Sequence, residues 1–282
     1  MGILTSRKIA DLYGRFKEID VTYTKEIVQV IGLQADQVHL KCVSDSFPCV
    51  IHSSSFLGAK VVANVNSGLM EKLQQTNNSV SLRFCFKNSD QGSPLTFFVA
   101  SHAVGHAAYG GSVDAALFAL QFTQRPPDDL IDIMGRFLDA NINSTKRRDE
   151  RIIINADTLR KLGILSNESI VFIQGAPRRC LLRDISFAEA KIVMAGADKS
   201  LEGQAAALRF DFQDPRKSFL IKGKFTQVED VESRKDLLAL VLSFDEAAVP
   251  MGYKMRLNDC LSTVRAGQSG EAEGASADGG KA

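Results

Sequence analysis

The sequence lacks the long apolar runs and the one-sided charge that are typical of membrane-spanning proteins and of proteins that bind nucleic acid broadly. No stretch approaches the roughly eighteen consecutive apolar residues that a membrane-spanning helix needs, and we see no apolar core of an export signal near the N-terminus. The 34 Lys and Arg residues are balanced by 33 Asp and Glu residues, which leaves a net charge of +1. Broad electrostatic binding to nucleic acid or to an anionic membrane is therefore disfavoured, and a site for an anion has to be a local cluster.

Motifs of catalysis and of metal binding are also missing. The sequence contains no GxSxG, no HExxH and no GxxxxGK[ST], and we predict a protein that is not an enzyme and needs no cofactor. His102 and His106 lie at a predicted strand end without acidic or cysteine ligands nearby, which favours a structural or exposed pair over a metal site. The five cysteines include no CxxC pair, and we expect reduced thiols in a cytoplasmic protein.

The chain repeats itself. Three pairs of similar segments occur in the same order along the chain, which is typical of a duplication followed by small changes in loop length. We therefore predict two homologous domains, since 282 residues with 45% hydrophobic composition suffice for two cores. Three pairs of segments match, at offsets that fall from 131 to 126 to 122: 53–62 (SSSFLGAKVV) with 184–193 (DISFAEAKIV), 82–86 with 208–212, and 119–122 with 241–244.

Each copy contains about six short segments with the character of strands. They alternate or run apolar, and Gly, Pro, Asn, Asp or Ser bounds them. Because closure removes exposed edges, we predict a mainly β protein with two tandem six-stranded antiparallel barrels, each followed by an α-helix. The predicted strands are residues 36–43, 48–56, 59–65, 79–87, 95–103 and 115–122 in the first copy, and 168–174, 180–187, 190–194, 205–212, 218–228 and 237–244 in the second.

Helix signals stand at the end of each copy and near the N-terminus. Pro126 and Pro127, followed by two aspartates, predict the start of one terminal helix, and Pro250 predicts the start of the other. Residues 5–18 predict a short amphipathic helix. The predicted domains are an N-terminal helix in residues 1–20, a first barrel domain in 21–143, a second barrel domain in 144–265, and a disordered tail without large apolar side chains in 266–282.

The densest positive run of the chain lies between the two copies. Residues 141–151 (NINSTKRRDER) are mostly polar and predict a linker, in which Arg147 and Arg151 are separated by three residues. Taken alone, the run is typical of a solvated hinge whose arginines pair with Asp149 and Glu150.

The surroundings of this run change its interpretation. It directly precedes a predicted barrel, and Asp184 and Ser186 follow Arg151 by 33 and 35 residues. This combination resembles the PilZ domain, the bacterial receptor module for cyclic di-GMP, which carries an RxxxR motif before a six-stranded barrel and a [D/N]xSxxG motif on an early strand. The resemblance covers about residues 144–265, and the repeat extends its fold to about residues 21–143. The two-barrel arrangement resembles the PlzA-type proteins of spirochaetes.

The resemblance implies a role in ligand binding for each motif residue. Arg147 and Arg151 would fold over the ligand, because an arginine fork suits a phosphate or the O6 and N7 atoms of guanine. Asp184 would accept from guanine N1–H and N2–H, and Ser186 would reach a phosphate through its hydroxyl or backbone N–H. Lys146 adds positive charge at a position where a basic residue of the family often accompanies a pair of bound ligand molecules.

The second motif departs from the family at one position. The family's glycine is Glu189 here, which adds bulk and negative charge near an anion. Two expectations stay open: its side chain turns away, or it pairs with an arginine of the hinge. Weaker binding of the ligand is one consequence to test. The predicted ligand-binding residues are Lys146, Arg147, Arg148, Arg151, Asp184, Ser186 and Glu189.

The first copy shows the reverse pattern. It keeps a serine and a glycine in Ser55 and Gly58, but Ser53 stands where the aspartate would be, and residues 21–26 before its barrel contain no RxxxR. We expect no nucleotide site in this copy, and a role as the wall against which the hinge closes.

The sequence therefore predicts a cyclic di-GMP effector that signals to an unidentified downstream protein by reorienting its domains. Two other classes stay open. One is a nucleic-acid-binding protein that uses its tandem barrels and the basic residues 146–151. The other is a structural adaptor with a vestigial pocket. Titration with the dinucleotide and with an oligonucleotide distinguishes the three.

Overall fold

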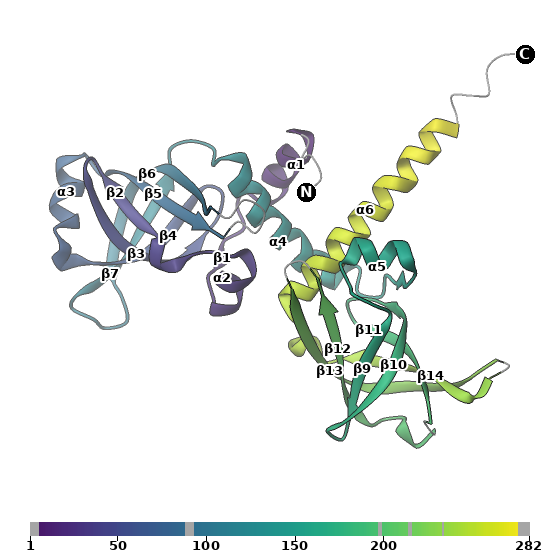
Figure 1. Ribbon diagram of the computed structural model, residues 1–282. Helices are drawn as coiled ribbons and strands as arrows, with labels where there is room; N and C mark the ends of the chain where they lie inside the picture. The colour runs from purple at the N-terminus through teal and green to yellow at the C-terminus, as the bar shows by residue number, and fades with distance from the viewer. Residues whose placement is uncertain (1–5, 88–92, 197–198, 214–215, 233, 276–282) are drawn as a thin grey trace, which may run out of the picture. The chain divides into compact units, whose positions relative to one another are not determined.

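The chain forms two compact units, each built around one barrel (Figure 1). The computed structural model describes residues 6–87, 93–196, 199–213, 216–232 and 234–275. The first unit is Met1–Leu138 and the second is Asp139–Ala282. The boundary between them falls inside helix α4 (Asp128–Lys146), so the segment with the predicted ligand motifs belongs wholly to the second unit.

Six antiparallel strands close the barrel of the first unit. They are hydrogen-bonded in the order β3-β2-β5-β6-β7-β4, and a further pairing of β4 with β3 completes the ring. A two-residue strand, β1, adds to β3 outside the ring. The strands are β1 (Val21–Thr22), β2 (His39–Cys42), β3 (Asp45–Ser54), β4 (Gly58–Asn64), β5 (Ser79–Phe86), β6 (Leu95–Ala108) and β7 (Ala115–Phe122).

The barrel of the second unit repeats this arrangement. Its ring has the order β10-β9-β12-β13-β14-β11, pairing of β11 with β10 closes it, and the two-residue strand β8 adds to β10. The prediction of two six-stranded antiparallel barrels is confirmed. The strands are β8 (Ile152–Ile153), β9 (Glu168–Ile173), β10 (Ala176–Ile185), β11 (Glu189–Ala195), β12 (Ala205–Phe212), β13 (Lys217–Val231) and β14 (Arg234–Phe244).

Alternation along the strands fills both barrels with apolar side chains. On β5, Leu82 and Phe84 point inward and are buried, and Leu208 and Phe210 do the same at the matching places of β12. Successive side chains of a strand face opposite sides, so this period of two is what the sequence pattern detected. Burial of such side chains contributes about 1.5–3 kcal/mol each, which makes the two cores the main source of stability.

Of the six α-helices in the described residues, three were predicted and three were not. The N-terminal helix α1 and the terminal helices α4 and α6 are present at the predicted places. The other three have seven residues each, too few to show a helical period in the sequence. The helices are α1 (Ser6–Phe16), α2 (Lys25–Ile31), α3 (Leu69–Gln75), α4 (Asp128–Lys146), α5 (Ala156–Leu162) and α6 (Met251–Ala275), with short 3-10 turns at Ala35–Gln37, Val65–Ser67, Lys199–Leu201 and Glu246–Ala248.

The predicted linker starts later than the sequence suggested. Residues 141–146 are the last turns of helix α4, and Asn143 and Ser144 are buried. The polar side chains are satisfied there, because Asn143 donates to Asp139 at 3.1 Å and to Asn258 of α6 at 2.8 Å. Asn258 in turn donates to Asp139 at 3.0 Å. A buried polar network of this kind cannot be told from a solvated linker by composition alone.

The predicted disordered tail is also shorter than expected. Helix α6 continues to Ala275, and only residues 276–282 of that prediction lie outside the described residues. Its first turns are anchored by buried apolar residues such as Leu257 and Leu261, and a helix that is already nucleated is extended more easily than it is started. Within the described segments, no helix is long and apolar enough to cross a membrane.

Candidate functional site

Strand pairing brings the two halves of the predicted ligand motif together. The short strand β8 begins directly after Arg151 and pairs antiparallel with the end of β10, so that Ile152 faces Ile185 and Ile153 faces Asp184. The backbone N–H of Ile154 donates to the carbonyl of Arg183 at 2.8 Å and continues this pairing. Arg151 therefore lies beside Asp184 although 33 residues separate them in the sequence.

Arg151 is held by two carboxylates. One of its terminal nitrogens, Nη1, donates to Asp184 Oδ1, and the other, Nη2, donates to Glu189 Oε1. Asp184 stands at the end of β10 and Glu189 at the start of β11, on either side of the turn that joins them. Of the two expectations for Glu189, the structure selects the pair with an arginine of the hinge.

The remaining basic residues lie at the end of α4 and on the turn between α4 and β8. The backbone N–H of Arg147 donates to Asn143 at 2.8 Å, which continues the helix by one residue, and its side chain lies 3.9 Å from Glu150. Glu150 also accepts from Arg265 of α6 at 2.6 Å. Lys146 is exposed at the C-terminal end of α4, where a cation is favoured by the helix dipole.

Arg148 points to a different carboxylate. Its Nη1 atom donates to Glu246 Oε2 at 3.1 Å, on the 3-10 turn that precedes α6. The two arginines of the RxxxR motif remain accessible, with 41% of the Arg147 side chain and 36% of the Arg151 side chain exposed. The site is thus an exposed cluster of cations. Both arginines of the RxxxR motif are paired with carboxylates of the same unit.

Ser186 has a different place from the one predicted. Its side chain is fully buried, and its hydroxyl oxygen accepts from the backbone N–H groups of Ala188 at 3.2 Å and Glu189 at 3.1 Å. Its own N–H donates to the Glu189 carbonyl at 2.8 Å. The serine therefore shapes the turn between β10 and β11 and thereby sets the positions of Asp184 and Glu189.

A residue of helix α6 also holds the turn between β10 and β11. The hydroxyl of Tyr253, which is completely buried, donates to the Ser186 carbonyl at 2.9 Å. Burial raises the pKa of Tyr253 well above its usual value, so the hydroxyl stays protonated and able to donate. Sequence reasoning missed this residue, because a tyrosine in an apolar helical stripe does not reveal which partner its hydroxyl will find.

Each barrel has a corner where a two-residue strand joins it, formed by β8 and β10 in the second barrel and by β1 and β3 in the first. The corner of the first barrel carries an acidic residue where the second has an arginine. Strand β1 pairs with β3 as β8 does with β10, so Asp20 takes the place of Arg151. Asp20 accepts from Ser53 at 3.0 Å and from Lys60 at 3.2 Å. Phe16, which is buried, takes the place of Arg147. The segment that matches the RxxxR motif is thus residues 16–20 rather than the predicted residues 21–26.

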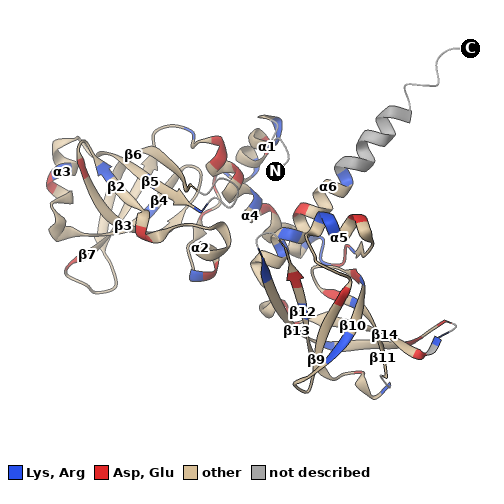
Figure 2. Ribbon diagram, viewed as in Figure 1, with Lys and Arg blue, Asp and Glu red and all other residues tan. Residues whose placement is uncertain are grey.

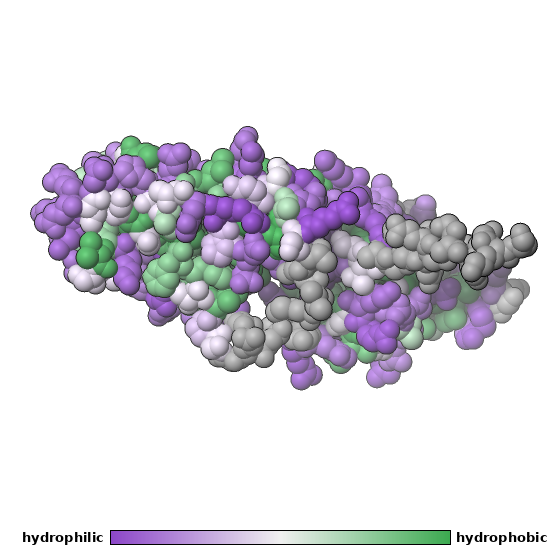
Figure 3. Space-filling model, turned by 90° about the horizontal axis from the view of Figure 1, so that it is seen from above, coloured by the Kyte–Doolittle hydropathy of each residue, from purple (hydrophilic) through white to green (hydrophobic). Residues whose placement is uncertain are grey.

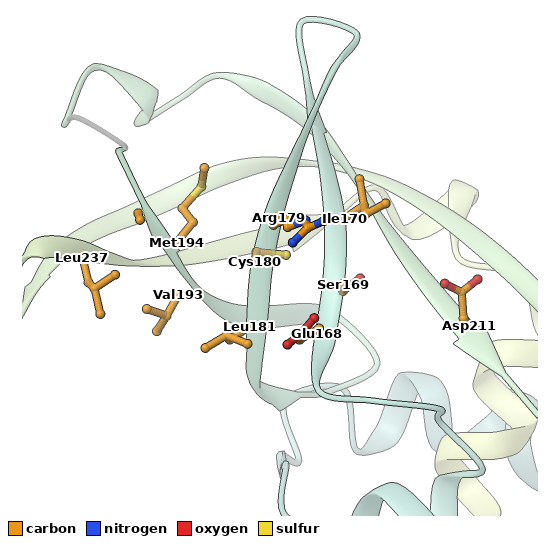
Figure 4. Close-up of a pocket in the computed structure, with 11 residues that line it drawn as sticks. Glu168, Ser169, Ile170, Arg179, Cys180, Leu181, Val193, Met194, Asp211 and Leu237 are labelled. Carbon is orange, nitrogen blue, oxygen red and sulfur yellow. The ribbon is translucent and has the colours of Figure 1, made fainter.

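A separate groove lies on the second barrel, away from this cluster. It has a volume of about 500 Å³ and contains none of the predicted ligand residues (Figure 4). Its apolar lining comes mainly from β10, β11 and β14, and three charged residues, Glu168, Arg179 and Asp211, also line it. The groove is lined by Glu168, Ser169, Ile170, Arg179, Cys180, Leu181, Val193, Met194, Ala195, Asp211 and Leu237.

The surfaces of both barrels mix charges of the two signs. Lys and Arg are interspersed with Asp and Glu along the strands and helices (Figure 2), and the face shown in Figure 3 has hydrophobic areas interrupted by hydrophilic residues. The described residues show no group of three or more His, Cys, Asp or Glu side chains placed to hold a metal ion.

Comparison with known proteins identifies the family. A family model described as the PilZN3 domain matches residues 7–141, which is essentially the first unit. The cyclic di-GMP binding protein of Treponema denticola is 41% identical over 266 residues, which cover 94% of this chain and 85% of that protein. The chain belongs to the PilZ family. Its first barrel is the PilZN3 domain, and the motifs described above lie in the second barrel of this PilZ protein.

Solved structures of three proteins are also similar to the chain over most of its length. The Borreliella burgdorferi PlzA protein in complex with c-di-GMP is 24% identical, with 91% of this chain and 99% of that chain covered and a TM-score of 0.41. YcgR from Escherichia coli in complex with c-di-GMP is 12% identical, with 88% of this chain and 93% of that chain covered and a TM-score of 0.31. The K. pneumonia MrkH–c-di-GMP complex is 11% identical, with 89% of this chain and 98% of that chain covered and a TM-score of 0.32. 

Proposed function

We propose that this chain is a cyclic di-GMP receptor that binds the dinucleotide at the second barrel. The proposal is supported chiefly by the pairing of β8 with β10, which places Arg151 of the RxxxR motif against Asp184 of the second motif. It is also supported by the Treponema denticola relative, which is named a cyclic di-GMP binding protein.

The residues of the cluster have chemistry that suits this ligand. Cyclic di-GMP offers phosphates and the edges of guanine bases. The guanidinium groups of Arg147 and Arg151 can bind a phosphate, or the O6 and N7 atoms of guanine, through two parallel hydrogen bonds. The Asp184 carboxylate can accept from N1–H and N2–H of guanine. Ser186 shapes the turn beside the ligand, in place of the direct phosphate contact expected from the sequence.

Binding has a structural consequence within the second unit. A ligand that takes over the donors of Arg147 and Arg151 replaces the pairs with Glu150, Asp184 or Glu189. The turn that carries the arginines joins α4, which spans the boundary between the units, to the second barrel. We propose that the signal is a change in the orientation of the units, passed to a downstream protein.

The proposal describes a receptor and not an enzyme. The five cysteines of the chain are buried free thiols, which suits a reducing compartment such as the cytoplasm. The interspersed charges of Figure 2 support a small anionic ligand at a local cluster rather than a long nucleic acid, which needs a continuous basic surface.

Isothermal titration calorimetry tests the proposal. We expect the full chain to bind cyclic di-GMP with a micromolar or smaller Kd, and Arg147→Ala and Arg151→Ala each to weaken binding by at least about tenfold, since each removes a charge-assisted hydrogen bond. Arg234→Ala is the matched control, because Arg234 pairs with Asp236 on β14 outside the cluster. The same titration with an oligonucleotide at two salt concentrations tests the alternative. Steeply salt-dependent oligonucleotide binding without a dinucleotide response would contradict the receptor.

A further inference from the structure

Glu189 stands where the first barrel has a glycine that cannot be replaced. Gly58 and Glu189 hold the same place in the turn, because their carbonyls accept from Ser55 at 2.9 Å and from Ser186 at 2.8 Å. A Cβ atom on Gly58 would lie 2.4 Å from the Leu120 carbonyl oxygen, so the backbone of the first barrel excludes any side chain there. The second barrel accommodates one at the equivalent place.

The side chain that the second barrel admits is directed to an arginine of the RxxxR motif. Glu189 is partly buried, with 24% of its side chain exposed, and its carboxylate binds Nη2 of Arg151. Asp184 binds Nη1 of the same guanidinium. Both terminal nitrogens of Arg151 thus have a carboxylate partner within the second unit.

This arrangement sets the protein's own carboxylate against the ligand. A phosphate or a guanine edge approaches arginine along the same pair of nitrogens that Asp184 and Glu189 hold. To bind Arg151 in this way, the ligand has to displace at least one of the two. A displaced Glu189 then leaves a negative charge close to an anionic ligand, which adds to the cost of binding.

We infer that Glu189 is an internal competitor for Arg151, which weakens binding of the dinucleotide and raises the concentration at which the receptor responds. The inference rests on the proposed function of the second barrel. It assigns to Glu189 an effect on affinity that is opposite in sign to the effect of a residue that contacts the ligand.

Two substitutions test this assignment by calorimetry with cyclic di-GMP on the full chain. Glu189→Gln removes the charge and keeps the shape of the side chain, and Glu189→Gly restores the glycine of the family motif. We expect each to lower the Kd by about tenfold, because a charged partner holds an arginine more tightly than a neutral one. The gain should shrink at higher salt, where the Arg151–Glu189 pair is screened.

Asp230→Asn is the matched control. It changes the net charge by the same amount, and Asp230 pairs with Lys199 at 2.8 Å on another part of the barrel. We expect its Kd to stay within about twofold of the unmodified chain, as for other exposed pairs. An equal gain in Asp230→Asn would show a general effect of net charge and would overturn the inference.

The outcomes separate the inference from the proposed function. If the unmodified chain binds the dinucleotide and Glu189→Gln binds it equally or more weakly, Glu189 is not a competitor and the receptor stands. If neither the unmodified chain nor the two Glu189 variants binds while all remain folded by circular dichroism, the proposed function itself fails.

Discussion

Asp20 and Arg151 occupy equivalent positions in the two barrels and carry opposite charges. Each directly precedes a two-residue strand that pairs with the matching part of its barrel. Arg151 binds the carboxylates of Asp184 and Glu189, whereas Asp20 binds the hydroxyl of Ser53 and the ammonium group of Lys60. The duplicated corner therefore keeps its geometry, but its charges suit an anionic ligand in one copy only.

The first prediction is that only the second barrel binds the dinucleotide. Asp20→Ala removes the acidic group of the first corner, and Arg151→Ala removes the basic group of the second. We expect Asp20→Ala to leave the Kd for cyclic di-GMP within about twofold and Arg151→Ala to raise it by at least about tenfold. Calorimetry of both variants checks this. Binding that survives in Arg151→Ala and disappears in Asp20→Ala would place the site in the first barrel and would contradict the prediction.

The second prediction concerns the turn between β10 and β11. Ser186→Ala leaves the buried N–H of Ala188 and the partly buried N–H of Glu189 without the hydroxyl oxygen that accepts from them. We expect the free energy of unfolding to fall by about 1–3 kcal/mol, the usual effect of unpaired buried donors. Urea denaturation followed by circular dichroism measures it. Ser55→Ala is the control, because Ser55 accepts from Leu57 in an exposed turn and its loss should have a smaller effect.

The third prediction follows from the crowded glycine of the first barrel. Gly58→Ala would place a Cβ atom 2.4 Å from the backbone oxygen of Leu120, which cannot move without disturbing the pairing of β4 with β7. We expect a loss of at least about 2 kcal/mol in the free energy of unfolding. Gly105→Ala, with no neighbouring atom within 4 Å of the added Cβ, is the control in the same barrel. Equal stabilities of the two variants would contradict the steric explanation.

The fourth prediction concerns alkaline pH. Burial, aided by the nearby charge of Asp20, raises the pKa of Tyr23 from 10.0 to about 12 against the effect of its hydrogen bond with Ser54. The unfolded chain then releases this proton at a lower pH than the folded protein does. The contribution of protonated Tyr23 to the free energy of unfolding is therefore complete below pH 10 and is lost as the pH rises from 10 towards 12.

Substitution of the tyrosine checks the sign of this effect. Tyr23→Phe cannot ionise, so its stability should fall less steeply than that of the unmodified chain between pH 10 and pH 12. At pH 8 the variant should be less stable by about 1 kcal/mol, because the hydrogen bond with Ser54 is lost. Thermal unfolding at a series of pH values measures both effects, and parallel pH profiles would contradict the prediction.

Much of the fold could be read from local patterns. Alternation with a period of two located the strands, and the three repeated segments predicted two copies of one barrel. Helices α2 and α5 escaped detection because seven residues show too little of a helical period. Their caps at Thr24 and Asn155 stand 131 residues apart, the offset of the repeat, so a search for capping residues in both copies could have found them.

The site could be predicted only in part. The spacing of Arg147 and Arg151 and the residues Asp184 and Ser186 together pointed to one ligand, because their residue types suit phosphate and guanine. Their roles within the site did not follow from the motif. Ser186 is buried inside a turn, where its hydroxyl oxygen accepts from Ala188 and Glu189 and its carbonyl accepts from Tyr253 of helix α6. The contact with α6 joins residues far apart in the sequence, so the motif did not reveal it.

The sequence alone determined the duplicated barrels and the presence of the motifs, since both are expressed in residue types at short spacing. Tertiary structure decided which charges meet. The pairing of β8 with β10 placed Arg151 between Asp184 and Glu189, and the spacing of neighbouring strands decided that Gly58 must be glycine while Glu189 has room for a side chain. Contacts of this kind join residues that are distant in the chain, and their geometry depends on how the strands around them pair and pack.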